Sequence, residues 1–230
     1  MKKIITTICL LSLIATAYGE EKVSVSAGAD LVSSYVWLGV AQGQGAAFQP
    51  NVAISYAGFT LGAWGSTSLD ASGGKEIDFS LSYELKGLTL KVTDFWWAGE
   101  AVKYFGTDSH FYEGAITYCF GEKFPLTLSV NTMFAGEGDK DASGEQQYST
   151  WIMASYDFSI NDFTVTPKIS FTPWDGMYAG DGQSKCLEAA ARISREVKIS
   201  EKLSLPLFAD VIFSPSQEDT YLVFGVSFSL

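Results

Sequence analysis

Residues 219–230, DTYLVFGVSFSL, alternate strictly between two files of side chains. One file is apolar and the other mostly small or polar; they consist of Leu222, Phe224, Val226, Phe228 and Leu230, and of Tyr221, Val223, Gly225, Ser227 and Ser229. A period of two is typical of a β-strand with one apolar face. Unpaired backbone is costly in lipid, so such a strand suits the position where a membrane barrel closes on itself. We therefore expect this stretch to pair with the first strand of the chain.

The same alternation recurs along the whole chain. Twelve segments are predicted, at residues 22–33, 46–56, 59–69, 75–85, 88–97, 109–120, 124–135, 146–158, 163–172, 184–196, 202–213 and 219–230. Strands that cross a bilayer at a tilt need about 9–11 residues, which these lengths suit. The sequence thus predicts an all-β fold, a 12-stranded antiparallel up-and-down transmembrane β-barrel.

Short and long connections alternate between these segments. The short ones are residues 57–58, 86–87, 121–123, 159–162 and 197–201. Most of the others are longer, at 34–45, 98–108, 136–145 and 173–183, with 70–74 and 214–218 as shorter exceptions. Outer-membrane barrels combine short periplasmic turns with longer outer loops, so we expect both termini at the periplasmic end. A soluble lipocalin-like barrel or a sandwich, which is the alternative, shows no such bias.

The N-terminal residues predict export. Lys2 and Lys3 precede an apolar run at residues 4–15, and the small residues Ala17 and Gly19 follow. This is the pattern of a cleaved signal peptide, and the run is too short to span a bilayer. We expect residues 1–19 to be removed and residues 20–230 to form a single barrel domain in the bacterial outer membrane.

Composition agrees with a membrane barrel and argues against nucleic acid as a partner. The formal net charge is −11, whereas binding to phosphates needs a basic surface. Aromatic residues, 14% of the chain, gather near both ends of the segments, where two interfacial belts are expected. The expected partners are outer-membrane lipid and the machinery that inserts barrels. No cofactor is expected.

A family resemblance rests on residues 30–97. The motifs that carry it are SYVWLG at 34–39, Gln42, GAWG at 62–65 and EID at 76–78. With these motifs the region resembles the Gcw_chp family of uncharacterised secreted bacterial proteins, and the remainder is similar to barrel-like proteins of Bacteroidota. The resemblance implies location and fold, and it implies no activity.

Charged residues on the polar files are predicted to line the lumen. They are Asp30, Asp78, Glu84, Lys91, Glu113, Lys168, Glu188, Arg192 and Asp210. A dry core seldom tolerates so many ionisable groups, whereas a wet or salt-bridged lumen does. They either line a small pore or pair with one another and plug it. Since acids outnumber bases, a pore is expected to favour cations or neutral solutes.

Two function classes remain open. One is a small passive channel for small polar solutes, and the other is a closed barrel whose loops bind a ligand or partner. Aromatic and acidic loop residues are the candidates for the second class: Tyr35, Trp37, Trp174, Asp175 and Tyr178. Alternatively, these residues anchor at the interface or fold the loops.

Signals for catalysis or metal binding are sparse. His110 follows Ser109, but no orienting acid or amide stands at a comparable local spacing, so a solvated histidine at the rim is the favoured interpretation. Residues 141–147 and 175–184 contain acids and glycines without the spacing of a calcium loop. We predict no enzyme activity and no metal site.

Cys119 and Cys186 are the cysteines that follow the predicted signal peptide. Both share the parity of lumen-facing neighbours, but the segments place them at opposite ends of the barrel. With a strand rise of about 3.3 Å per residue they are roughly 25 Å apart, far beyond the reach of a disulfide. Both are expected to be free thiols.

Overall fold

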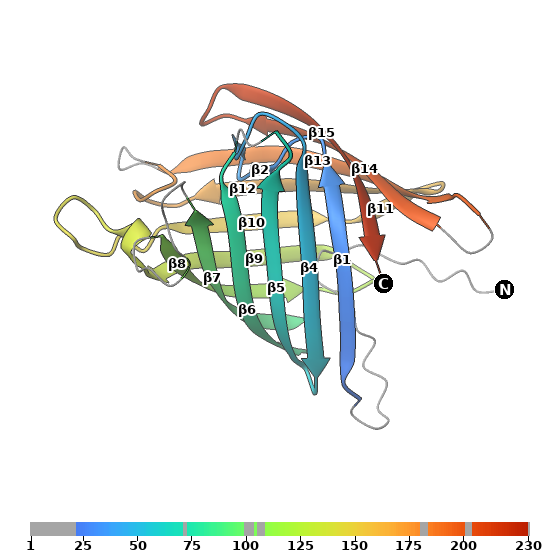
Figure 1. Ribbon diagram of the computed structural model, residues 1–230, viewed down its shortest axis with the longest axis horizontal. Helices are drawn as coiled ribbons and strands as arrows, with labels where there is room; N and C mark the ends of the chain where they lie inside the picture. Colours follow the sequence, from blue (N-terminus) through green and yellow to red (C-terminus); the bar gives the residue numbers. More distant parts are fainter. Residues whose placement is uncertain are drawn as a thin grey trace.

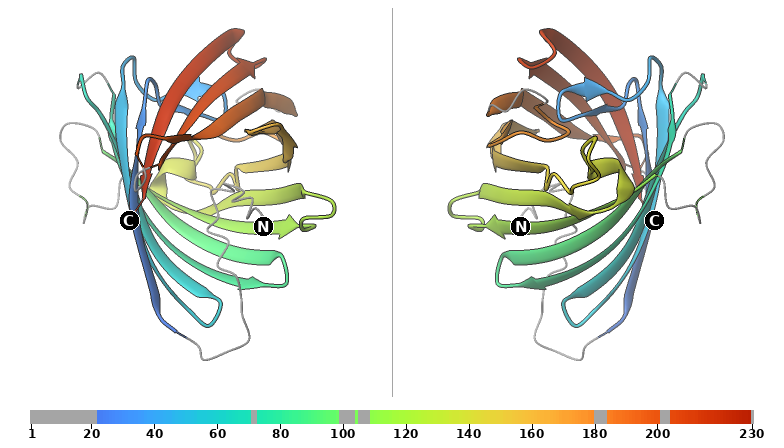
Figure 2. Two further views of the ribbon diagram at one scale, coloured as in Figure 1. Left: turned by 90° about the vertical axis from the view of Figure 1, so that its right-hand side faces the viewer. Right: turned by 90° about the vertical axis from the view of Figure 1, so that its left-hand side faces the viewer.

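The computed structural model describes residues 22–70, 73–98, 104, 109–179, 184–200 and 204–229. The predicted signal peptide lies outside these described residues. Figure 1 shows long strands that follow one another around a curved wall in chain order, and the end views in Figure 2 show this wall bending round into a barrel.

The wall consists of antiparallel strands paired with their neighbours in sequence. They are β1 (Ser24–Val32), β4 (Ala47–Tyr56), β5 (Phe59–Ser68), β6 (Lys75–Leu85), β7 (Leu88–Ala98), β8 (His110–Cys119), β9 (Leu126–Ala135), β10 (Thr150–Tyr156), β11 (Phe158–Ile160), β12 (Phe163–Thr172), β13 (Lys185–Lys198), β14 (Ser204–Ser214) and β15 (Asp219–Ser229). Two shorter strands, β2 (Val36–Trp37) and β3 (Val40–Ala41), form a separate hairpin within the first loop. A short 3₁₀ helix, Glu137–Asp139, lies in the loop after β9.

The barrel is closed and has twelve strand positions, as the sequence predicts. β15 pairs with β1, with Val226 opposite Leu31, so the final segment closes on the first. The sheet contains thirteen strands, but β10 and β11 are consecutive pieces of one wall strand, because both pair with β12. Asp157 separates the two pieces.

The tight turns owe their shape to residues with a positive φ. Ala57 and Gly58 have φ of 51° and 83°, and Lys86 and Gly87 repeat these values. Two successive left-handed residues define the two-residue hairpin turn that matches the twist of the flanking strands. Ser24, at the start of β1, pairs with Ser55 beside the first of these turns, so the described chain begins at the end of the barrel that carries the tight turns.

Side chains alternate between an apolar exterior and a polar interior. Along β6, Glu76 and Asp78 are 5% and 9% exposed, whereas Ile77 and Phe79 between them are 37% and 45% exposed. Antiparallel partners point to the same side of a sheet, so the ladder carries this pattern from strand to strand. The outer surface is therefore a continuous apolar band and the charged files point inward.

An aromatic girdle lines the part of the tight-turn end that lies between β5 and β10. Phe59 packs on Tyr83 with ring centroids 4.6 Å apart, and the pairs Tyr118–Phe120, Phe120–Phe124 and Phe124–Tyr156 continue the row. Amphipathic and aromatic rings prefer the depth of lipid headgroups. The girdle thus lies where the sequence places one of the two expected belts.

A β-bulge changes the predicted facing of Cys186. The register of β12 on β13 shifts between Ser170 and Phe171, so that Ser170 pairs with Glu188 but Phe171 pairs with Cys186. Phe171 belongs to the apolar exterior at 40% exposure. Cys186 therefore shares the outward side, and its predicted inward facing is wrong because a bulge inserts an extra residue, here Leu187.

Both cysteines are free thiols in the structure, as predicted. Each is partly buried, so we expect a small maleimide to add one label at Cys119 and one at Cys186 after detergent extraction. Intact-mass spectrometry with and without prior reduction measures this. A requirement for reduction before labelling would contradict the strand register, because it would indicate a Cys119–Cys186 disulfide.

Candidate functional site: the lumen and its mouth

One side of the inner wall is acidic. Glu76 and Asp78 on β6 and Glu113 on β8 point inward and are 5%, 9% and 4% exposed. We call these three residues the acid cluster. The Glu113 carboxylate accepts a hydrogen bond of 2.8 Å from Nε1 of Trp151. Lys91 on β7 is a basic group whose charge acts on both Asp78 and Glu113.

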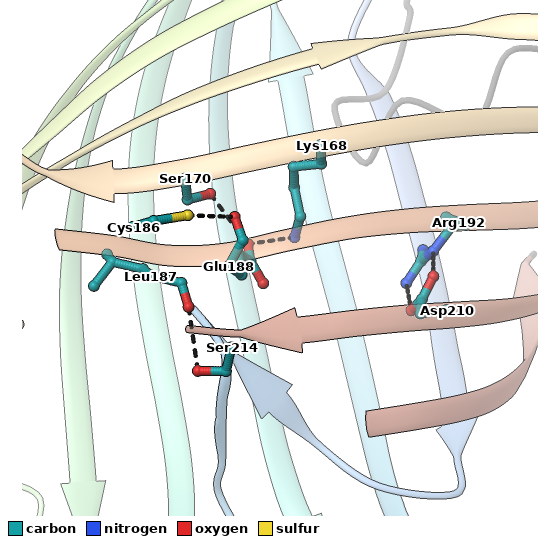
Figure 3. A network of polar contacts seen from close by, with 8 residues as sticks. All are labelled: Lys168, Ser170, Cys186, Leu187, Glu188, Arg192, Asp210 and Ser214. Carbon is teal, nitrogen blue, oxygen red and sulfur yellow. Dashed lines mark hydrogen bonds and ion pairs between the residues drawn. The ribbon is translucent and has the colours of Figure 1, made fainter. Parts of the chain in front are cut away.

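A second side of the wall is charged but internally paired (Figure 3). Lys168 Nζ lies 2.7 Å from the buried carboxylate of Glu188, which also accepts a hydrogen bond of 3.1 Å from Ser170. Arg192 donates to both oxygens of Asp210, at 2.7 and 2.8 Å. In the order of strands around the barrel, β6 and β13 stand six positions apart, so acidic and ion-paired sides face each other.

The Arg192 side chain is also held by an aromatic ring. Its guanidinium lies over Phe208 at 4.0 Å from the ring centroid, a cation–π geometry. Phe208 belongs to a small apolar cluster on the inner face, together with Val32, Ala47, Ile212 and Val223. Part of the lumen is thus filled by packed side chains.

The two remaining predicted lumen residues lie away from both groups. Asp30 on β1 is partly buried and pairs across the ladder with Gln49 and Ser227. Glu84 lies near the tight-turn end of β6, where it pairs with Thr89 and is exposed. All nine predicted residues lie on the inward files, and the direct ion pairs among them in the described part of the chain are Lys168–Glu188 and Arg192–Asp210.

Aromatic residues fill the mouth at the end opposite the tight turns. Trp37 on the first-loop hairpin has ring centroids 6.2, 5.5 and 5.8 Å from Phe95, Trp97 and Tyr178. Phe95 and Trp97 stand on the inward file of β7 and stack on each other, and Tyr178 comes from the loop after β12. We call these four residues the aromatic plug, because rings from two loops pack onto the inner wall.

The loop candidates therefore separate into two groups. Trp37 and Tyr178 belong to the aromatic plug, and Tyr35 packs edge-on against Trp64 inside the barrel. Trp174 is 48% exposed and donates from Nε1 to the carbonyl of Tyr148, whereas the exposed Asp175 accepts from the amide of Gly176. The five residues do not form one exposed rim.

Burial keeps the two loop tyrosines of this region neutral. Burial, followed by the charge of Glu76 and a hydrogen bond to it, raises the pKa of Tyr35 well above its ordinary value. Burial, followed by the charges of Glu113 and Asp139, likewise raises the pKa of Tyr178. The Tyr178 hydroxyl, although buried, has no hydrogen-bond partner in the described structure.

His110 is not the solvated histidine that the sequence suggested. It is 8% exposed; its Nδ1 lies 2.6 Å from Asp94 Oδ1, and its Nε2 lies 2.6 Å from the carbonyl of Tyr104. The acid stands sixteen residues away and reaches the ring across the β7–β8 ladder, which explains why local spacing did not reveal it. Both ring nitrogens face acceptors, so neither is available as a base toward Ser109.

Several inward residues escaped the sequence-based prediction. Glu76 stands two residues before Asp78 on the same strand, so its side chain faces the same side and the same reasoning would have placed it in the lumen. Phe95 and Trp97 lie in the run DFWW at 94–97, where aromatic residues occupy both faces and hide the alternation. Among the described residues, no group of three His, Cys, Asp or Glu is placed to hold a metal ion, and no helix is long and apolar enough to cross a membrane.

Comparisons with known proteins return barrels among solved structures. No family model and no curated protein matches the chain. The NanC porin is 10% identical over 90% of this chain and 99% of that chain, with a TM-score of 0.46. A mutant of the Rh. blastica porin is 11% identical over 91% of this chain and 100% of that chain, with a TM-score of 0.38.

An engineered protein described for asymmetric conductivity is 17% identical, with a TM-score of 0.41. The match covers 80% of this chain and 55% of that chain, so this chain spans about half the length of the engineered protein. The barrel architecture of the present chain is established by its own strand ladders.

Proposed function

We propose that the protein is a bacterial outer-membrane barrel that acts as a small passive channel for small polar solutes, with a preference for neutral or cationic ones. The observation that carries this proposal is the acid cluster, whose three carboxylates share the inner wall with one nearby lysine, Lys91. Four of the other predicted lumen residues form the ion pairs Lys168–Glu188 and Arg192–Asp210, and the remaining two, Asp30 and Glu84, are both acids. A net negative lumen attracts cations and repels anions.

The membrane location is supported by the exterior of the barrel. Large apolar side chains are exposed on the outer file of nearly every wall strand, among them Leu61, Leu81, Ile116 and Leu222 at 54–58% exposure. Contact between such an apolar band and lipid tails costs no free energy, whereas its contact with water is unfavourable. Outer-membrane lipid and the barrel-insertion machinery are accordingly the expected partners, and no nucleic acid is expected.

Ion selectivity in planar bilayers tests the channel proposal. We expect the purified protein to conduct K⁺ in preference to Cl⁻, and the Asp78→Asn, Glu113→Gln double variant to lose most of this preference. Both changes preserve shape while removing negative charge. Reversal potentials under a KCl gradient measure the effect, with Glu84→Gln as the control outside the acid cluster. Anion selectivity of the unaltered protein would contradict the proposal.

A closed barrel with binding loops is the second candidate, and the aromatic plug favours it. Trp37 and Tyr178 reach from separate loops onto the wall and narrow the mouth. They pack inward and are therefore not needed as anchors at the bilayer interface. The absence of any measurable conductance from correctly folded protein would support this candidate over the channel.

Protease access on intact cells tests the proposed orientation. The loop at residues 136–149 protrudes with the 3₁₀ helix at the end opposite the tight turns, and its residues 140–145 are exposed. We expect an added protease to cleave within 140–145 and to spare Ala57–Gly58 and Lys86–Gly87. Mass spectrometry of the fragments locates the cuts. Cleavage at the tight turns with an intact 140–145 segment would mean that the orientation is inverted.

A further inference from the structure

The acid cluster contains a buried polar atom that nothing in the described structure satisfies. Asp78 is 9% exposed, and its Oδ1 atom has no hydrogen-bond partner. A buried carboxylate oxygen without a donor is costly, and each such group calls for a specific explanation. Glu76 stands two residues away on the same inward file of β6, so two buried acids are neighbours on this part of the wall.

A second unsatisfied atom lies close to the same cluster. The buried hydroxyl of Tyr178 also has no partner, and the charge of Glu113 acts on it. Tyr178 packs edge-on against Trp37. Unpaired polar atoms are therefore present both on the wall and on a loop that contributes to the aromatic plug.

Aromatic rings and carboxylates alternate across this part of the wall. Asp78 on β6 stands directly opposite Phe95 on β7, and Glu76 stands directly opposite Trp97. Trp97 donates a hydrogen bond to Glu76, which fixes its ring beside the acid. Directly opposed residues on one face of a sheet have Cβ atoms about 4.5–5.5 Å apart. Asp78 and Glu76 are thus each flanked by an aromatic side chain across the β6–β7 ladder.

This combination has a defined chemical complement. Aromatic faces attract organic cations through the ring quadrupole, and carboxylates attract them by charge. A metal ion would require several ligands converging on one point, and the described residues offer no such group. An ammonium group spreads its charge over a larger, partly apolar surface and fits a lining of rings and acids.

We propose that the acid cluster and the aromatic plug together bind an organic ammonium group, at the mouth of the lumen, with Asp78 as the principal charged contact. The inference deepens the proposed function by naming the class of solute, and it also holds for a closed barrel that binds without conducting.

Calorimetry on the detergent-extracted full barrel tests this inference with choline as the probe. Its neutral isostere, 3,3-dimethyl-1-butanol, has the same shape without the charge and serves as the ligand control. We expect choline to bind and the isostere to bind at least about tenfold more weakly, because both the cation–π and the carboxylate contributions are lost. Equal binding of the two probes, or no binding of choline, would overturn the inference.

Matched variants locate the site. Asp78→Asn is expected to weaken choline binding about tenfold, and Trp37→Leu about fivefold, the size of one cation–π contact. Glu84→Gln, an inward acid on the same strand outside the cluster, is expected to leave choline affinity unchanged. Loss of affinity in Glu84→Gln equal to that in Asp78→Asn would overturn the site, because it would indicate a nonspecific effect of lumen charge.

Conductance measurements separate this inference from the proposed function. Choline binding that depends on Asp78 in a barrel that does not conduct would sustain the site and contradict the channel. Cation-selective conductance without choline binding would sustain the channel and contradict the site.

Discussion

Replacing Trp37 with Ala is expected to increase single-channel conductance about twofold or more. Its ring packs against Phe95, Trp97 and Tyr178, so it links the first-loop hairpin to the inner wall and to the loop after β12. Hydrophobic constrictions block a pore both by their size and by excluding water, and removal of the central ring relieves both effects. Planar-bilayer recordings at fixed voltage measure the change.

Trp174→Ala is the matched control for this prediction. Trp174 is another loop tryptophan, but it is 48% exposed, and it donates a hydrogen bond from Nε1 to the carbonyl of Tyr148. We expect its removal to leave conductance within the scatter of the unaltered protein. Equal conductance of Trp37→Ala and the unaltered protein would mean that the narrowest part of the pathway lies elsewhere.

The sequence predicts the wall of this barrel far better than its interior. Strand alternation has a fixed period, and the positive-φ residues at Ala57–Gly58 and Lys86–Gly87 mark their turns locally, so strand number, order and closure can be read from the chain. Facing follows from parity, which holds along β6 but fails at the bulge beside Cys186. A bulge adds one residue without a distinctive sequence pattern, and from that point the parity is reversed.

The mouth could not be predicted because it is built by long-range contacts. Trp37 and Tyr178 are far apart in sequence, and no local pattern indicates that both loops fold inward onto Phe95. The same holds for the contact of Asp94 with His110, which forms only after β7 and β8 pair. Glu76 is different: its parity with Asp78 was available in the sequence, so the acid cluster could have been predicted in full.

The Arg192–Phe208–Gly225 stack shows how the ion-paired side of the wall is held in place. Phe208 on β14 stands directly opposite Gly225 on β15, and Arg192 covers the ring while it binds Asp210. A Cβ atom at Gly225 would lie 2.1 Å from Cζ of Phe208, which is too close for any real contact. The ring cannot turn away freely, because Arg192 and the apolar cluster around Val223 occupy the neighbouring space.

Gly225→Val is therefore expected to lower the free energy of unfolding by about 2–3 kcal/mol, the cost of overpacking a filled interior. Urea unfolding in lipid vesicles, followed by tryptophan fluorescence, should show a midpoint lower by about 1 M. Gly114→Ala is the control, because a Cβ there meets its nearest atom, in Phe134, at an ordinary 3.6 Å. Phe208→Ala in the Gly225→Val background should recover part of the lost free energy of unfolding, because removal of the ring vacates the space that valine needs. The effects of the two substitutions are thus expected to be non-additive. Strictly additive effects would show that Gly225 is required for the backbone conformation of β15 and not to leave space for the Phe208 ring.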